Sequence, residues 1–121
     1  MKIEMNEKTL AAFKESAEAA SSLLTAMANA KRLVVLCNLL EGEKTVGRLA
    51  EIVGLTVAAA SQHLAKMRAL GLVRTRRDGQ QIHYRLASTE VEEVLKTLYA
   101  LYCAPKIDLG APVTSYDTTP R

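Results

Sequence analysis

Two short amphipathic segments, joined through one glycine, constrain the fold of this 121-residue chain more than any other feature. Thr45 can cap the first segment and Gly54 can end it. Only Leu55 separates that glycine from Thr56, which can cap the second segment. Such a tight corner between two helices is typical of helix pairs that bind DNA.

The second segment, residues 56–71, has an apolar line on one side and small or polar side chains on the other. The inward line is formed by Ala60, Leu64, Met67 and Gly71. Helical geometry places Ser61 and Gln62 among alanines on the opposite face, with His63 and Lys66 towards one flank. One amide and one hydroxyl among small residues fit a DNA groove, whereas bulky apolar residues there would favour a second core contact.

A β-hairpin is predicted directly after this helix, with strands at residues 72–75 and 82–86. The intervening loop contains Asp78-Gly79, a strong hairpin signal because a tight turn needs positive φ. Basic residues cluster in this region against the single acid Asp78, namely Lys66, Arg68, Arg74, Arg76, Arg77 and Arg85. Such a stripe is typical of phosphate-binding surfaces, although scattered charges are commonly just solvated. The pattern predicts a mostly α fold with a β-hairpin wing, a winged helix-turn-helix.

The remaining helices flank this unit, and the length fits one domain. A helix from about residue 6 to 27 carries one apolar stripe, which either a partner subunit or a helix of the same chain could cover; the stripe is Leu10, Phe13, Ala17, Ala20 and Leu24. A second helix is predicted over 31–40. The last helix is capped by Ser88 or Thr89 and ends at Cys103. We therefore expect a domain over 1–103 and a flexible tail over 104–121, where all three prolines lie.

The start of the chain has no apolar run, and no segment is apolar enough to span a bilayer, so we expect a cytoplasmic protein without membrane contact. A permanent disulfide is disfavoured in that compartment. The two cysteines, Cys37 and Cys103, could then be core residues, metal ligands or redox-active thiols. Cys37 lies within the apolar run LVVLCNLL, so a simple packing role remains open for it.

Three segments together resemble the ArsR/SmtB family of bacterial winged-helix repressors: ANAKRL from Ala28, TVGRLAE from Thr45, and LTVAAASQHLAKMRALGLV from Leu55. The hairpin TRRDGQQIHYRL extends the resemblance, which covers about residues 20–103. It implies a homodimer built by the first and last helices. It also implies a repressor of double-stranded operator DNA with an inverted repeat.

The family's known metal-ligand positions can be compared with the residues of this sequence. Arsenic and cadmium sensors have Cys-x-Cys in the first helix of the DNA-binding pair, and TVGRLAEIV has no cysteine. Zinc and nickel sensors have histidine ligands on the last helix, and EVEEVLKTLYALYC has none. We therefore expect neither a metal site nor a cofactor.

The cysteine-bearing pieces LVVLCNLL and LYALYC resemble the BigR/SqrR-like branch, which senses persulfides and related reactive sulfur species. That likeness implies a Cys37–Cys103 dithiol that forms a di- or polysulfide bridge and releases operator DNA. This chain lacks the third cysteine of some relatives. It also has Val57-Ala58 where many have Gln-Ser, so its operator is expected to differ.

Ser61 and Gln62 are the candidates for base contacts, because a glutamine amide can pair with adenine at two positions. The candidates for phosphate contacts are Thr56, Lys66, Arg76 and Arg77, while His63 could bind phosphate or pack.

Three alternatives remain: a repressor of this fold that responds to a metal ion or a general oxidant, a dithiol enzyme handling sulfur, and a dimeric module without DNA binding. The enzyme is disfavoured because the sequence has no Cys-x-x-Cys, nucleophile–base pair or Gly-rich cofactor loop.

Overall fold

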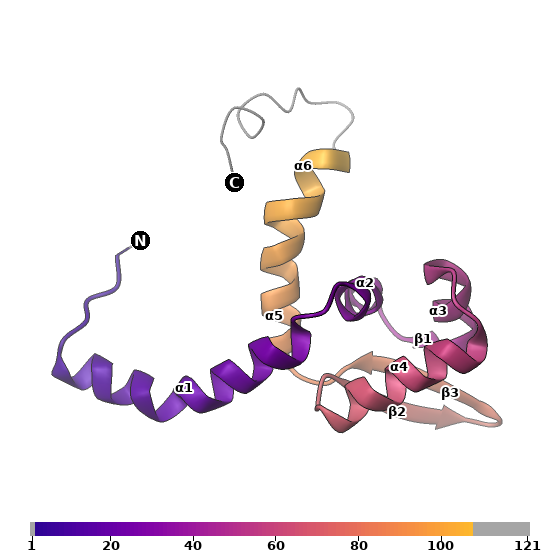
Figure 1. Cartoon of the computed structure of the whole chain (residues 1–121), viewed down its shortest axis with the longest axis horizontal. Coiled ribbons are helices and arrows are strands. Elements are labelled where there is room, and N and C mark those ends of the chain that lie inside the picture. The colour runs from indigo at the N-terminus through magenta and orange to yellow at the C-terminus, as the bar shows by residue number, and fades with distance from the viewer. Residues whose placement is uncertain (1, 108–121) are drawn as a thin grey trace.

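The computed structural model describes residues 2–107, which form a helical body with a small sheet and a projecting first helix (Figure 1). The helices are α1 (Glu7–Met27), α2 (Ala30–Asn38), α3 (Val46–Val53), α4 (Val57–Ala69), α5 (Thr89–Leu98) and α6 (Ala104–Ile107). The strands are β1 (Lys44–Thr45), β2 (Val73–Asp78) and β3 (Gln81–Leu86). A 3₁₀ turn, Leu39–Glu41, follows α2, and a π-helical turn, Tyr99–Cys103, joins α5 to α6. The predicted mostly α fold with a hairpin wing is confirmed.

Local capping explains where α3 and α4, the predicted helix pair, begin and end. The Thr45 hydroxyl accepts a hydrogen bond from the backbone N–H of Arg48 at 3.2 Å, and the Thr56 hydroxyl accepts one from Ala59 at 3.1 Å. Each bond satisfies an N–H that has no partner within its helix. Between the helices, Gly54 adopts a left-handed conformation with φ 74°. Glycine reaches that region without steric cost, so the corner forms where the sequence predicts it.

The sheet is longer towards its tip than the predicted strands, and it has a third strand. β3 lies between β1 and β2, and both pairings are antiparallel. The ladder continues through Arg77↔Ile82 to Asp78↔Gln81, because backbone pairing does not require the apolar alternation on which the predicted boundaries rested. The turn is reduced to Gly79-Gln80, with Gly79 at φ 64°. Positive φ at the first central residue fits a type II′ hairpin.

The core lies where the end of α1, α2, α3, α4, the base of the hairpin and the start of α5 meet. Its largest fully buried side chains are Leu36, Leu49, Leu64, Met67, Leu72, Leu95 and Val91. The predicted inward line of α4 is buried at Ala60, Leu64 and Met67, with Leu64 at 1% and Met67 at 0% exposure. The prediction was wrong for Gly71, which is exposed because α4 ends at Ala69. This core holds α4 and the hairpin in a fixed relation within a single chain.

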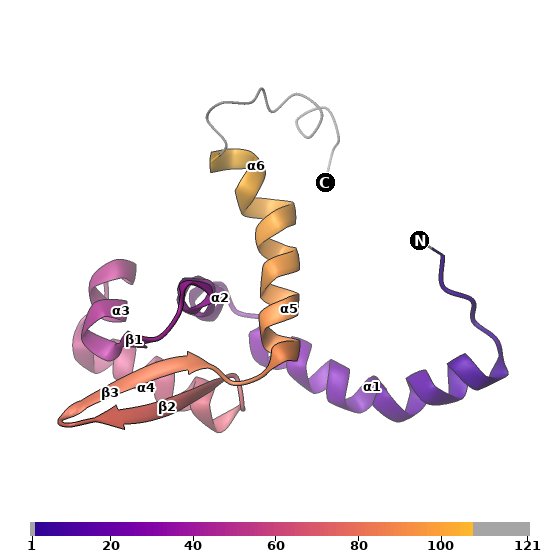
Figure 2. The same ribbon diagram turned by 180° about the vertical axis from the view of Figure 1, so that it is seen from behind.

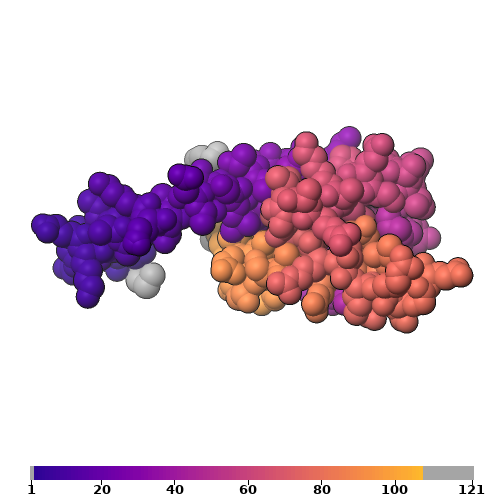
Figure 3. Space-filling view, turned by 90° about the horizontal axis from the view of Figure 1, so that it is seen from below, coloured from indigo at the N-terminus to yellow at the C-terminus, as the bar shows by residue number. Residues whose placement is uncertain are grey.

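The two ends of the described chain project from this body. α1 runs sideways, and α5 with its π turn rises away from the sheet (Figure 2). The space-filling view shows the first turns of α1 extending well beyond the body (Figure 3). Leu10 and Phe13 of the apolar stripe are exposed. Within residues 2–107, therefore, no helix of the same chain covers that part of the stripe.

The predicted tail begins with a short helix, since Ala104–Ile107 continue the helical path beyond Cys103. The rest of the expected tail, residues 108–121, lies outside the described residues. No single helix among the described residues is long and apolar enough to cross a membrane. α1 and the segment Ala30–Glu41 satisfy that test only as a pair, and they are bent by 94°.

Candidate nucleic-acid interface and thiol site

The outer face of α4 is centred on Gln62. Gln62 and Lys66 are exposed, one turn apart, among exposed alanines. Ser61 and His63 are half-buried and lie at the two edges of this face. Their position follows from the buried line, because residues one position away from an inward residue fall at the flanks of a helix. Gln62 is therefore better placed than Ser61 to reach into a groove.

Thr56 is exposed at the N-terminus of α4, where its hydroxyl already serves the capping bond. The free backbone N–H groups of the first turn and the positive end of the helix dipole point outward from this end. Such an end attracts a phosphate group. The prediction that Thr56 contacts phosphate would therefore be met by the backbone N–H groups at this end rather than by the Thr56 hydroxyl.

The two wing arginines lie on opposite faces of the hairpin. Side chains alternate along a strand, and directly paired residues share a face. Arg77, paired with Ile82, is on the face shared with core-packing Tyr84, whereas Arg76, paired with His83, is on the other face. Both arginines are exposed. The sequence did not separate these two residues, and the register does.

Arg76 is engaged by a carboxylate that the sequence reading missed. Its Nε donates to both carboxylate oxygens of Glu43, at 3.1 and 3.2 Å, and its Nη2 donates to Oε1 at 2.8 Å. The hydrogen bond from Arg76 holds the pKa of the Glu43 carboxyl below its usual range, and the same contact raises the pKa of the Arg76 guanidinium. Arg76 can hold a phosphate only by sharing or releasing Glu43.

Glu43 reaches the wing because it precedes β1, which pairs with β3. A strand of two residues has no periodicity that a sequence pattern can reveal. Glu43 and Arg76 are also 33 residues apart along the chain. The local sequence around Glu43 therefore carries no signal for this contact.

The two cysteines lie at one site. Cys37 on α2 and Cys103 at the end of the π turn line the same hollow of about 430 Å³. The rest of its lining is mainly apolar and aromatic: Leu33, Val34, Asn38, Leu98, Tyr99 and Tyr102. Both thiols are free. Residues 66 positions apart are thus brought to one surface by the packing of α2 against α5.

The two thiols differ in their surroundings. Cys37 is half-buried and packs against the core, whereas Cys103 is exposed. Burial raises the pKa of the Cys37 thiol, and the neighbouring Cys103 raises it further. Because the thiolate is the reactive form, a raised pKa makes Cys37 less nucleophilic at neutral pH than an unperturbed cysteine.

Metal coordination has little support elsewhere in the described chain. Across residues 2–107, no three His, Cys, Asp or Glu side chains gather as a cation site. His83 lies in the sheet, and its Nε2 is buried with no hydrogen-bond partner among those residues. The thiol hollow thus offers two sulfur ligands and no third side chain of these types.

Comparison with known proteins agrees with this arrangement. Residues 29–75 match the family model described as bacterial regulatory protein, arsR family. The chain is 49% identical over 81 residues to the transcriptional activator HlyU of Vibrio cholerae, covering 67% of this chain and 75% of that protein. It is 36% identical over 107 residues to the biofilm growth-associated repressor of Agrobacterium fabrum, covering 88% and 92%.

Among solved structures, the transcriptional repressor BigR from Xylella fastidiosa superimposes with a TM-score of 0.71 at 33% identity, covering 83% of this chain and 99% of that one. These relatives are transcriptional regulators rather than enzymes. The helix pair of α3 and α4, the exposed face of α4 and the wing are the parts by which winged helix-turn-helix proteins bind DNA. The chain therefore belongs to the arsR family of bacterial regulatory proteins, as a DNA-binding transcriptional regulator.

Proposed function

We propose that this regulator is a cytoplasmic repressor that senses reactive sulfur species and then releases its operator. The observation that carries the proposal is the shared hollow, which is lined by Cys37 from α2 and Cys103 from the end of the last long helix. Relatives named as repressors support the direction of regulation, although the similar HlyU is named an activator.

The DNA-bound form is a homodimer on an inverted repeat. The exposed stripe on α1 and the exposed Leu101 and Tyr102 in the π turn after α5 are apolar surface that a second copy can cover. A twofold dimer places two α4 helices in successive major grooves, about 34–36 Å apart. Gln62 then reads a base edge, and Lys66, Arg77 and the α4 N-terminus hold phosphates.

Persulfide chemistry can close the dithiol without a further oxidant. The exposed Cys103 thiolate attacks the outer sulfur of a persulfide RSSH, so that Cys103 becomes a persulfide and RS⁻ leaves. The Cys37 thiolate then attacks the inner, Cys103 sulfur, forming a disulfide and expelling HS⁻. The sulfur–sulfur bond of the persulfide supplies the oxidising equivalent.

A longer bridge uses a second persulfide. The terminal sulfur of the Cys103 persulfide, once deprotonated, attacks the R-bearing sulfur of another RSSH and expels HS⁻. Cys37 then attacks the sulfur originally transferred to Cys103, and RS⁻ leaves with its electron pair. The product is a trisulfide between the two cysteines. Such a bridge suits thiols held farther apart than the roughly 4.4–6.8 Å between Cα atoms that a disulfide requires.

The bridge would act on DNA through the position of α5 relative to the body. α2 packs against both α3 and α5. A link between Cys37 and the π turn would therefore tie the helices that hold α4 to the projecting end of α5. Release follows only if the bridged conformer spans the two half-sites less well than the reduced one.

The test compares wild type with Cys37→Ser and Cys103→Ser after exposure to an organic persulfide, hydrogen peroxide or Zn²⁺, with DNA affinity and intact mass followed together. With persulfide, wild type should lose two hydrogens per chain, gain a whole number of sulfur atoms or none, and bind operator about 5–150-fold more weakly. The serine variants should keep their DNA affinity. Equal release by peroxide favours a general oxidant, and release by Zn²⁺ without a covalent change favours a metal sensor.

The base-reading role has its own test. Gln62→Ala should lower the preference for operator over random DNA by about 1–3 kcal/mol for a bidentate base contact. Equal losses on the two DNAs would assign Gln62 to general binding instead.

A further inference from the structure

A hollow of about 400 Å³ with hydroxyl and cationic side chains in its lining lies where α1, α2 and α4 meet, apart from the thiol site. Its lining combines hydroxyl groups, two cationic side chains and short apolar contacts: Ser21, Ser22, Thr25, Ala26, Arg32, Lys66 and Leu70. No carboxylate is among these residues. Hydroxyl, guanidinium and ammonium donors without a competing acid are the groups that bind phosphate oxygens.

Arg32 is the fixed cation of the hollow. It is half-buried, and its Nη1 donates to the backbone oxygen of Ala26 at 2.8 Å. This bond anchors the guanidinium at the corner between α1 and α2. A guanidinium has five N–H donors, and within residues 2–107 the others take no protein acceptor. The remaining donors are therefore available to an anion.

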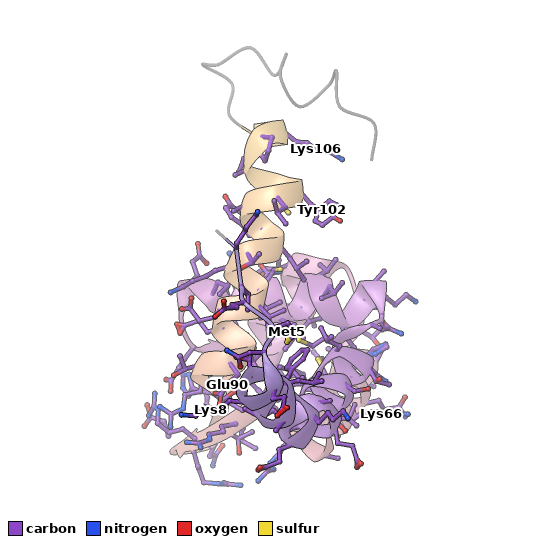
Figure 4. All side chains as sticks on the ribbon, turned by 90° about the vertical axis from the view of Figure 1, so that its left-hand side faces the viewer. Met5, Lys8, Lys66, Glu90, Tyr102 and Lys106 are labelled. Carbon is purple, nitrogen blue, oxygen red and sulfur yellow. The ribbon has the colours of Figure 1, made fainter. Side chains whose placement is uncertain are left out.

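Lys66 ties the hollow to the DNA-reading face. It lies one turn after Gln62 on the exposed face of α4, and no carboxylate of the described chain pairs with it. A view along α1 shows Lys66 on one side of that helix and Glu90 on the other (Figure 4). The hollow thus extends the exposed face of α4 towards α1, on the side away from Glu90.

The α1 hydroxyls stay open when the apolar stripe is covered. Ser22 and Thr25 are three residues apart and share a side of α1. Leu24 of the stripe is adjacent in sequence to Thr25, so it points about 100° away around the helix. A partner subunit packed on the stripe therefore leaves these hydroxyls facing the hollow.

We infer that this hollow binds a backbone phosphate of duplex DNA, beyond the bases that α4 reads. The inference rests on the proposed DNA-binding function, and it assigns DNA contacts to α1 and α2, outside the helix pair and wing. Arg32 supplies the fixed charge, Lys66 the mobile charge, and the α1 hydroxyls supply neutral donors.

The test places a negative charge in the hollow with Ser22→Asp, and the same charge on α5 with Thr97→Asp as the matched control. Both residues are exposed on helices. Binding to operator and to random duplex is measured over a range of salt concentrations, with circular dichroism and light scattering to verify fold and oligomeric state. Ser22→Asp should weaken binding to both DNAs about three- to tenfold. It should also reduce the salt dependence of binding by about the contribution of one phosphate contact per protomer, and Thr97→Asp should do neither.

Two further measurements make the assignment specific. In a Lys66→Gln background, Ser22→Asp should cost less than in wild type, because both changes disable one phosphate site. Inorganic phosphate is titrated in parallel by following amide chemical shifts around Ser22 and Arg32. Shifts with inorganic phosphate but equal DNA binding by the two Asp variants would assign the hollow to a free oxyanion and overturn the DNA contact. If wild type binds no DNA at all, the proposed function fails; if wild type binds and Ser22→Asp is unchanged, only this inference fails.

Discussion

The body and the arms of this chain differ in how far they bury their own apolar side chains. The body, from Ala26 at the end of α1 through the hairpin to the start of α5, buries its own apolar side chains and fixes α4 beside the wing within one protomer. The arms, the rest of α1 and the end of α5, leave large apolar side chains exposed, among them Phe13 at 58% and Tyr102 at 60%. The relation of α4 to the wing is thus fixed within one chain, whereas the arms present the apolar surface that the proposed dimer would cover. Cys37 belongs to the body and Cys103 to an arm, so a bridge would link the two regions.

A leucine-to-alanine substitution in each region should give the largest difference in unfolding free energy. Leu64→Ala in the body removes a side chain that is 1% exposed and should lower the free energy of unfolding by about 2–5 kcal/mol, through lost burial and a cavity. Leu24→Ala in the arm removes one that is 57% exposed. Its main effect should be on dimerisation, so its destabilisation should fade as protein concentration rises. Denaturant unfolding at several concentrations measures both, and a large concentration-independent loss for Leu24→Ala would erase the distinction.

Within the body, the two wing arginines should differ in their importance for DNA. Arg77→Ala should weaken all duplexes about tenfold and flatten the salt dependence, as expected for one lost phosphate contact per protomer. Arg76→Ala should weaken them less, because Glu43 already occupies that guanidinium. Salt-dependent anisotropy titrations compare the variants, and a larger loss for Arg76→Ala would mean that DNA displaces Glu43 readily.

The Glu43 contact can be relieved directly. Glu43→Gln should raise affinity for every duplex about two- to fivefold, because it frees Arg76 and removes a nearby negative charge. Glu41→Gln is the matched control, since Glu41 pairs with Lys44 at 2.6 Å rather than with a wing arginine. The same titrations apply. Weaker binding by Glu43→Gln would show instead that the carboxylate aims Arg76 at DNA.

The smallest effect concerns pH and the half-buried thiol. The pKa of Cys37 in the folded protein is raised, chiefly by burial. The neutral thiol therefore contributes its full stabilisation of the fold at any pH below the ordinary pKa of a cysteine. That contribution is lost as pH rises through the raised pKa. The unfolding midpoint of Cys103→Ser should therefore fall at alkaline pH more than that of a Cys37→Ala, Cys103→Ser double variant. Parallel curves would mean that burial does not perturb this thiol.

Sequence patterns sufficed where the cause was local. Thr45, Gly54 and Thr56 define the helix corner through contacts within a few residues, and the alternation around Asp78-Gly79 located the hairpin. The patterns fell short where the cause was distant. Nothing near Glu43 indicated its pairing with Arg76, which depends on β1 joining β3.

The candidate sites show the same division. Helical spacing identified the outer face of α4 but gave Ser61 the same standing as Gln62, although the packing around Ala60 and Leu64 leaves Ser61 half-buried. Periodicity on α1 found the apolar stripe and left open what covers it. The answer depends on the path of the chain after Met27, which no pattern within α1 encodes.

The π-helical turn at Tyr99–Cys103 has a consequence for how the thiol hollow evolves. The N–H of Ala104 bonds to the carbonyl of Tyr99, so this turn holds one residue more than an α-helical turn would. A π turn absorbs its extra residue locally, so deleting one residue there would restore ordinary α-helical winding and leave the helix beyond the turn close to its present direction. The change would fall on the side chains within the turn, where Cys103 is the last residue. A one-codon deletion could therefore alter how Cys103 meets the hollow, with both cysteines still encoded and the course of the chain almost unchanged.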